Sequence, residues 1–285
     1  MKRFNMAFPQ TVGEACTQLE EHPGSRVIAG GTAITVVMKE GVYTPELLIN
    51  LRGLEDDLRF IEDDGDSVRI GALSTLRDVE RSAIIEDKFP TVVQCLQEIA
   101  GVRVRNSATL GGHLSHADVH LDLPPVLAGY DAEIVVSSGD DSRQLLLTDF
   151  LKGYYETALE ENEIVTEIVL PKPEAGRRGT YVKHRYFSEV DWPCVGVAAF
   201  ATPNGDQFED VEVLLNSVSH NPVLRLDGVN DVVDGDLSDE HIDAVADLAR
   251  DQSSPSSDLR GSANYKEQMA GVFTKRALRK VRADV

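Results

Sequence analysis

Two glycine pairs, each following an apolar segment, constrain this chain more than any other feature. The first lies in Ile28-Ala29-Gly30-Gly31-Thr32 and the second in Ala108-Thr109-Leu110-Gly111-Gly112. Adjacent glycines allow a sharp turn that presents consecutive N–H groups to one point, and a ligand phosphate is the usual occupant of such a concave run of amides. Two such loops predict two walls around one pyrophosphate, although most Gly-Gly pairs are plain turns.

The polar residues after each pair fit the same interpretation. Thr32 can cap the segment that follows it, Thr109 and Ser115 add hydroxyls, and Asp122 adds a carboxylate that can accept from a sugar hydroxyl. The chain has no Gly-x-Gly-x-x-Gly run, no P-loop and no Gly-x-Ser-x-Gly motif. We therefore expect neither a Rossmann turn nor a serine nucleophile, and we name no catalytic residue.

Charge and cysteine content exclude several classes of protein. The 285 residues include 48 acidic and 28 basic side chains, for a net charge of −20, which argues against nucleic acid or an anionic membrane as partner. We find no apolar run of membrane-spanning length. Cys16, Cys95 and Cys194 form no Cys-x-x-Cys motif, which is typical of a reducing, cytoplasmic setting. This chain cannot by itself ligate a conventional iron–sulfur cluster.

Hydrophobic periodicity and turn residues predict an α+β chain. In the first 175 residues, strands are expected at 26–29, 46–51, 58–61, 68–70, 134–136, 145–147 and 164–170, and Val102–Arg105 alternates as on a strand. Helices are expected after Thr11, at 33–39, from Thr75 through Ile85, from Pro90 to Gly101 and from Asp122 to Leu127.

A proline- and glycine-containing segment, 171–176, predicts a linker and a second domain beyond it. Strands are expected there at 180–183, 195–201 and 211–215, and helices at 241–250, capped by Ser238, and at 264–281. We expect an opening β-turn-α-β unit over 1–53, a second subdomain over 54–175 and a C-terminal domain over 176–285.

Two groups of side chains have the composition of a chemical site. The first group consists of His113, His116 and His120, which lie near Asp118 and Asp122 in the sequence and could bind zinc. The favoured interpretation is that these are loop residues around a bound ligand. Lys183 precedes Trp192, the single tryptophan. Such a lysine could face the edge of a flavin ring and stabilise its reduced form, or be a surface lysine near a core tryptophan.

Taken together, these segments resemble the flavin-binding medium subunits of the molybdenum hydroxylases, nearly end to end. That family includes the medium subunit of aerobic carbon monoxide dehydrogenase and the flavin part of xanthine dehydrogenase. The resemblance rests on the two glycine loops, Ser115–Asp118, Asp122–Pro124, Glu163–Pro171, Lys183–Trp192, Ser262–Lys266 and Arg276–Leu278. The family commonly has Asn, Pro, and Asp or Ser where this chain has His113, Val119 and Ala33.

The resemblance implies a two-subdomain FAD-binding domain of the vanillyl-alcohol-oxidase type and a smaller C-terminal domain with a three-stranded antiparallel sheet and helices. It implies that the diphosphate of FAD is held by Ala29, Gly30, Gly31, Thr32, Ala33 and Ile34 together with Thr109, Leu110, Gly111 and Gly112, and that Ile28 also belongs to the FAD-binding residues. Asp122 looks like the ligand of the FAD hydroxyls, and Ser115 and Asp118 also belong to the implied FAD-binding residues. Val165 is implied on the adenine side, and Lys183 and Trp192 are implied near the flavin ring.

The resemblance also implies a role in a complex. Substrate would be oxidised at a molybdenum cofactor on a large subunit, and a small subunit with two [2Fe–2S] clusters would deliver electrons to this chain for transfer to NAD⁺, oxygen or a quinone. An alternative is a stand-alone FAD-dependent oxidoreductase resembling the cell-wall enolpyruvyl reductase. A third interpretation is a zinc-binding module built on His113, His116 and His120.

Overall fold

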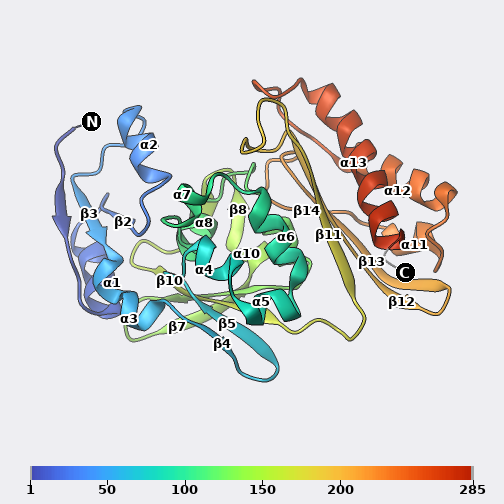
Figure 1. Ribbon diagram of the computed structural model, residues 1–285. Helices are drawn as coiled ribbons and strands as arrows, with labels where there is room; N and C mark the ends of the chain where they lie inside the picture. The colour runs from blue at the N-terminus through green and yellow to red at the C-terminus, as the bar shows by residue number, and fades with distance from the viewer. Residues whose placement is uncertain (1, 284–285) are drawn as a thin grey trace.

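A three-stranded parallel sheet begins the computed structural model, which describes residues 2–283. Its strands are β1 (Asn5–Ala7), β2 (Arg26–Ile28) and β3 (Leu47–Asn50), in the order β1-β3-β2. Helix α1 (Val12–Glu21) begins at Thr11, whose hydroxyl accepts from the Glu14 N–H as predicted. Cys16 and Leu19 of α1 pack with Ile49 of β3 in a small apolar core. This subdomain, in blue, carries α2 (Ile34–Lys39) directly after the first glycine pair (Figure 1).

The second subdomain is built on a five-stranded antiparallel sheet in the order β4-β5-β10-β6-β7. The strands are β4 (Ile61–Asp63), β5 (Ser67–Gly71), β6 (Glu133–Ser137), β7 (Ser142–Leu146) and β10 (Ile164–Pro171). Its helices are α4 (Leu76–Glu80), α5 (Ala83–Lys88), α6 (Pro90–Glu98), α7 (Val102–Arg105), α8 (Leu110–His116), α9 (Leu123–Ala128) and α10 (Leu147–Phe150). A 3₁₀ turn (Leu51–Leu54) and α3 (Glu55–Leu58) connect the subdomains, and β8 (Leu151–Gly153) pairs with β9 (Glu156–Thr157).

The C-terminal domain contains a four-stranded antiparallel sheet. The expectation of three strands was wrong by one short strand, β14. The strands are β11 (Arg178–His184), β12 (Val195–Asn204), β13 (Gln207–Asn216) and β14 (Leu224–Arg225). The helices are α11 (Val229–Val233), α12 (Asp239–Gln252) and α13 (Ala263–Ala283). β14 escaped prediction because two residues carry no readable periodicity.

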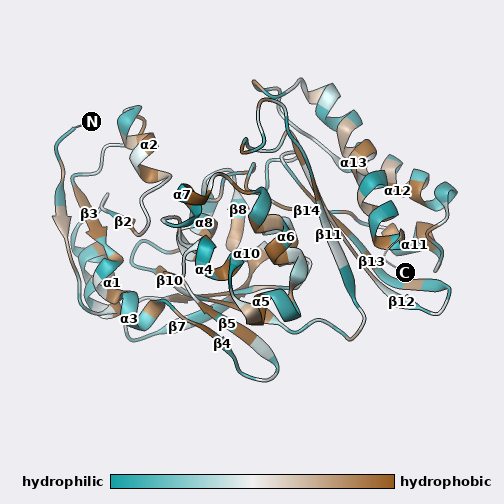
Figure 2. Ribbon diagram, in the orientation of Figure 1, coloured by the Kyte–Doolittle hydropathy of each residue, from teal (hydrophilic) through white to brown (hydrophobic). Residues whose placement is uncertain are grey.

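Both faces of this C-terminal sheet are covered. Ala198 and Phe200 of β12 join the core of the second subdomain, whereas Val197 and Ala199 join the core beneath α12 and α13. β12 is therefore buried without interruption from Val195 to Ala201, which explains its continuous apolar run. Figure 2 shows that α12 and α13 mix hydrophilic and hydrophobic residues, as expected of helices with one face on a sheet.

Three predictions for the first 175 residues were wrong in detail. The strand expected at 58–61 begins only at Ile61, because Leu58 ends the helix α3, and the helix capped by Thr75 stops at Glu80 before α5 begins. Val102–Arg105 is the helix α7, not a strand. Val102 and Val104 are exposed, and the Arg105 side chain turns inward to Glu80 and to the carbonyl of Ile99, so the alternation did not mark a sheet face.

Candidate functional site

The first glycine loop joins β2 to α2 and presents backbone donors that the protein itself does not use. Ile28 ends β2, Ala29 through Ala33 form the loop, and Ile34 begins α2. Gly31 has φ +69°, a left-handed conformation that suits glycine. Among residues 2–283, no acceptor lies within hydrogen-bond distance of the N–H groups of Gly30, Gly31, Thr32, Ala33 and Ile34. Half-buried, unsatisfied amides of this kind suit an anionic ligand.

The two glycine regions meet in space. A Cβ atom built on Gly30 would lie 1.7 Å from the carbonyl oxygen of Ser107 and 3.1 Å from the Cα of Ala108. No side chain fits there, so the glycine is required for the close approach of two backbones. The approach places the first loop against the segment that leads into Thr109, which is the adjacency expected of two walls around one ligand.

The second glycine loop uses its amides differently from the prediction. The Leu110 N–H donates to the Ser74 carbonyl at 2.8 Å, and the Gly111 N–H donates to the Ala72 carbonyl at 2.9 Å. The expectation that this loop presents consecutive free N–H groups is therefore wrong. The segment after β5 lies alongside the loop and takes up these donors, which no local pattern could reveal.

The polar atoms of the second loop also support its own helix. Thr109 caps α8 by accepting from the Gly112 N–H at 3.2 Å, and its hydroxyl proton has no acceptor among the described residues. A Cβ on Gly111 would lie 2.6 Å from the Cβ of Ala72. Gly111 is thus needed for close packing, and its φ is not in the left-handed region. Ser115, half-buried in α8, makes no side-chain hydrogen bond within residues 2–283.

Asp122 and Lys183, from different domains, form one buried ion pair. The Lys183 Nζ lies 2.9 Å from Asp122 Oδ2 and 3.0 Å from the Glu98 carbonyl. The two side chains are 1% and 7% exposed, respectively. The Tyr181 hydroxyl donates to Asp122 Oδ1 at 2.6 Å. These bonds leave one of the three Lys183 donors and one lone pair on each Asp122 oxygen without a partner.

Burial sets the electrostatics of this pair. Burial raises the pKa of Asp122 above its ordinary value, while the charge of Lys183 and the hydrogen bonds from Tyr181 and Lys183 oppose that rise. Burial likewise raises the pKa of Tyr181 well above its ordinary value, so its hydroxyl stays a donor. Removing one partner of such a pair typically costs about 3–5 kcal/mol because the other charge is left buried alone.

The three histidines differ in burial and in partners. Burial lowers the pKa of His113 to about 3, and its Nε2 is buried without a partner. His116 packs against Trp192, whose ring centroid lies 6.5 Å away, and His120 lies 5.8 Å from the same ring. His120 also bonds Asp118. Within residues 2–283, no group of three or more His, Cys, Asp or Glu side chains is arranged to hold a metal ion, so the zinc interpretation gains no support.

The remaining predicted residues lie near α8, because Val165 shares the core of Leu110 and Trp192 packs on His116. Val165, on β10, pairs with Val136 of β6 and is 6% exposed. Trp192 follows β11 in a loop and is 38% exposed.

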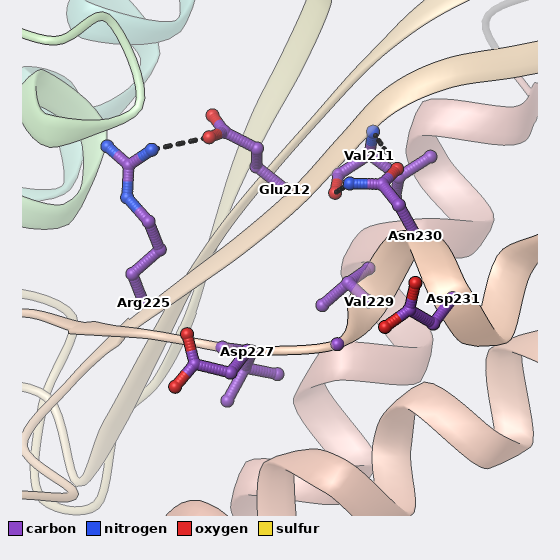
Figure 3. Close-up of a pocket in the computed structure, with 9 residues that line it drawn as sticks. Val211, Glu212, Arg225, Asp227, Val229, Asn230 and Asp231 are labelled. Carbon is purple, nitrogen blue, oxygen red and sulfur yellow. Dashed lines mark hydrogen bonds and ion pairs between the residues drawn. The ribbon is translucent and has the colours of Figure 1, made fainter.

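A separate pocket of about 280 Å³ lies at the edge of the C-terminal domain, between β13 and the start of α11 (Figure 3). The Arg225 side chain pairs there with Glu212 and continues to Asp131. Asn230 bonds the backbone of Val211 through both atoms of its amide. These groups are engaged with one another, and Arg225 alone among them reaches the other domain, at Ala128 and Asp131.

Sequence reasoning missed three participants. Tyr181 lies two residues before Lys183 on β11, and period-two spacing could have placed both side chains on one face. Ser107 and the Glu98 carbonyl contribute only backbone atoms, for which the sequence carries no signal.

Comparison with known families identifies this arrangement. Residues 2–173 match the family described as "FAD binding domain in molybdopterin dehydrogenase", and residues 181–281 match "CO dehydrogenase flavoprotein C-terminal domain". The chain belongs to the FAD-binding medium subunits of the molybdenum hydroxylase family, which are oxidoreductase subunits. The unsatisfied amides beside the Gly30–Ser107 contact fit the diphosphate of that cofactor.

Individual relatives cover nearly the whole chain. The carbon monoxide dehydrogenase medium chain of Hydrogenophaga pseudoflava is 31% identical, over 97% of this chain and 96% of its own length. The glyceraldehyde dehydrogenase medium chain of Sulfolobus acidocaldarius is 28% identical, over 98% of both chains. Among solved structures, carbon monoxide dehydrogenase from H. pseudoflava aligns with a TM-score of 0.95 at 32% identity, covering 99% of this chain and 98% of that one.

One further finding concerns the described helices. None of those in residues 2–283 combines the length and the apolar character needed to cross a lipid bilayer.

Proposed function

We propose that this chain binds FAD and transfers electrons within a multi-subunit molybdenum hydroxylase, from [2Fe–2S] clusters on a small subunit to an external acceptor. A large subunit with a molybdenum cofactor would oxidise the substrate. The support is family membership and the names of relatives, which include a nicotine 6-hydroxylase medium subunit and carbon monoxide dehydrogenase medium chains. The acceptor would be NAD⁺, oxygen or a quinone.

The single observation that carries the proposal is the run of unsatisfied amides from Gly30 to Ile34, set against Ser107 by a contact that only glycine permits. These donors would hold the diphosphate, with the free hydroxyl protons of Thr32 and Thr109 as further donors. Leu110, Gly111 and Gly112 would shape the opposite wall without donating. When bound, FAD accepts single electrons and releases pairs of electrons.

Asp122 and Lys183 would contribute charge close to the cofactor. Asp122 would accept from an FAD hydroxyl through its remaining lone pairs, and Lys183 would place a positive charge near the ring, which favours the reduced form. Trp192 would help to cover the ring, Val165 would pack on the adenine side, and Ser115 would donate its hydroxyl proton. Asp118, whose oxygens accept from His120 and Tyr155, would hold the segment that leads to Asp122 in place.

The test is flavin content of the full-length chain, alone and co-purified with its partner subunits. We expect an absorbance band near about 450 nm, typical of oxidised flavin. Absence of that band from both preparations after addition of FAD would contradict the proposal. Substrate turnover by the lone chain with NADPH would instead favour the stand-alone oxidoreductase. The three free, buried cysteines support placement in the reducing cytoplasm.

A further inference from the structure

A continuous series of hydrogen bonds crosses the boundary between the two domains. The Tyr155 hydroxyl donates to Asp118 Oδ2 at 2.7 Å, and Asp118 Oδ1 lies 2.8 Å from Nδ1 of His120. The other ring nitrogen of His120 lies 3.1 Å from Asp258 Oδ2, which also accepts from Lys266 at 2.7 Å. His120 is therefore the link between a loop of the FAD-binding domain and the loop that precedes α13.

Both partners of His120 are carboxylates whose pKa is lowered. Burial raises the pKa of Asp118, but hydrogen bonds from His120 and Tyr155 outweigh that effect and hold the pKa below its ordinary value. The pKa of Asp258 is lowered in the same way. Burial raises it, but the hydrogen bond from Lys266 and further hydrogen bonds outweigh that effect. Both carboxylates are thus acceptors, so both contacts of His120 are hydrogen bonds only when each ring nitrogen carries a proton.

The segment that His120 belongs to is the one that leads to the Asp122–Lys183 pair. It begins at Ala117, whose φ of +48° lies in the left-handed region that non-glycine residues adopt only under external constraint. The Val119 carbonyl accepts from the Ser217 N–H at 2.9 Å, and other bonds from β11 and β13 follow. His120 supplies the contact to a different element, the Asp258 loop, and its side chain is only 14% exposed.

We propose that His120 is a positioning residue for FAD: by bonding Asp118 and Asp258 together, it holds the segment from Asp118 to Asp122 in the place where Asp122 meets Lys183. The inference rests on the proposed function, because it assigns the segment a role in cofactor binding. Charge-assisted bonds to both partners explain why an ionisable ring stands at a nearly closed domain boundary.

The test replaces His120 by Gln in the full-length chain. Glutamine offers one donor group and one acceptor, so one carboxylate is left facing an oxygen. We expect FAD to bind about tenfold more weakly, which corresponds to about 1.4 kcal/mol. We also expect faster hydrogen–deuterium exchange at the amides of residues 118–122 in the FAD-free chain. His241→Gln is the matched control, because His241, on α12, bonds the carbonyl of Asp236 just before that helix and should change neither readout.

A second variant supplies the donors with a different side chain. His120→Arg offers donors for two carboxylates, so its FAD affinity should stay within about threefold of the wild type. The proposal is overturned if His120→Gln loses stability but keeps full FAD affinity, or if His120→Arg binds no better than His120→Gln. If the wild-type chain binds no FAD, the proposed function fails, while unchanged exchange at residues 118–122 would separately overturn the role of His120.

Discussion

The two glycine loops share a sequence pattern and differ in what their backbones do. In the first loop, the N–H groups from Gly30 to Ile34 have no acceptor within the described part of the chain. In the second, Leu110 and Gly111 donate to the segment after β5. Gly30 is required for contact with Ser107 in the other subdomain, whereas Gly111 is required for packing on Ala72 in its own.

The difference teaches that a glycine pair does not by itself mark a ligand site. The first loop offers free N–H donors to a ligand, whereas the second loop packs within its own subdomain and forms the opposite side of the site. The following substitutions separate these two roles, because a change in the first loop should weaken FAD binding, whereas a change in the second loop should first lower the free energy of unfolding.

Gly30→Ala should have the largest effect on binding. The new Cβ would meet the Ser107 carbonyl at 1.7 Å, so the two loops must move apart. We expect FAD affinity to fall at least about 100-fold, or roughly 2.7 kcal/mol, measured by flavin fluorescence titration. Gly13→Ala is the control, because a Cβ there meets only Thr11 Oγ1 at 4.0 Å. Unchanged affinity in Gly30→Ala would show that the loop contact is not part of the site.

Gly111→Ala should act mainly on stability. The Cβ would lie 2.6 Å from the Cβ of Ala72, and overpacking of this kind costs about 2–3 kcal/mol. Urea unfolding followed by circular dichroism measures this cost. In protein that remains folded, FAD affinity should fall less than in Gly30→Ala. The reverse order would mean that the second loop is the principal donor.

Asp118→Asn tests the far end of the second loop, beyond α8. The pKa of Asp118 is lowered in the folded state, so its contribution to stability is complete above the unfolded pKa of about 4 and is lost as pH falls through the folded value. We expect a cost of about 1.5 kcal/mol near neutral pH. The difference between wild type and variant should shrink below about pH 4 in denaturant titrations. A difference independent of pH would contradict the ionised bond to His120.

Thr32→Val and Thr109→Val form a matched pair with the smallest expected effects. Thr109 caps α8, so its loss should lower the free energy of unfolding by about 1 kcal/mol. The Thr32 hydroxyl bonds no other residue in the range 2–283, so Thr32→Val should leave stability unchanged and weaken FAD binding a few-fold. Thermal unfolding measures the stability of both variants, and fluorescence titration measures their FAD affinity. Equal effects of the two substitutions on both measurements would remove the distinction between the loops.

Sequence reasoning was most successful where the signal is local and repeated. The helices capped by Thr11 and Ser238 and the long strand β10 were predicted, because caps and periodicity are properties of neighbouring residues. α7 was mistaken for a strand because four residues can satisfy a period of two by chance. The glycine loops, Asp122 and Lys183 were singled out from the sequence and stay predicted FAD contacts, whereas the match to the FAD-binding family confirms the class of protein they indicated.

What the sequence by itself determined was where the chain turns, where it is stiff and which chemical groups it carries. Only the tertiary structure decided which of those groups are free. The amide of Gly111 and that of Gly31 are indistinguishable in sequence, yet one faces the Ala72 carbonyl and the other has no acceptor in the described chain. The physical reason is that a hydrogen bond is completed by whichever segment packs alongside, and that partner comes from elsewhere in the chain.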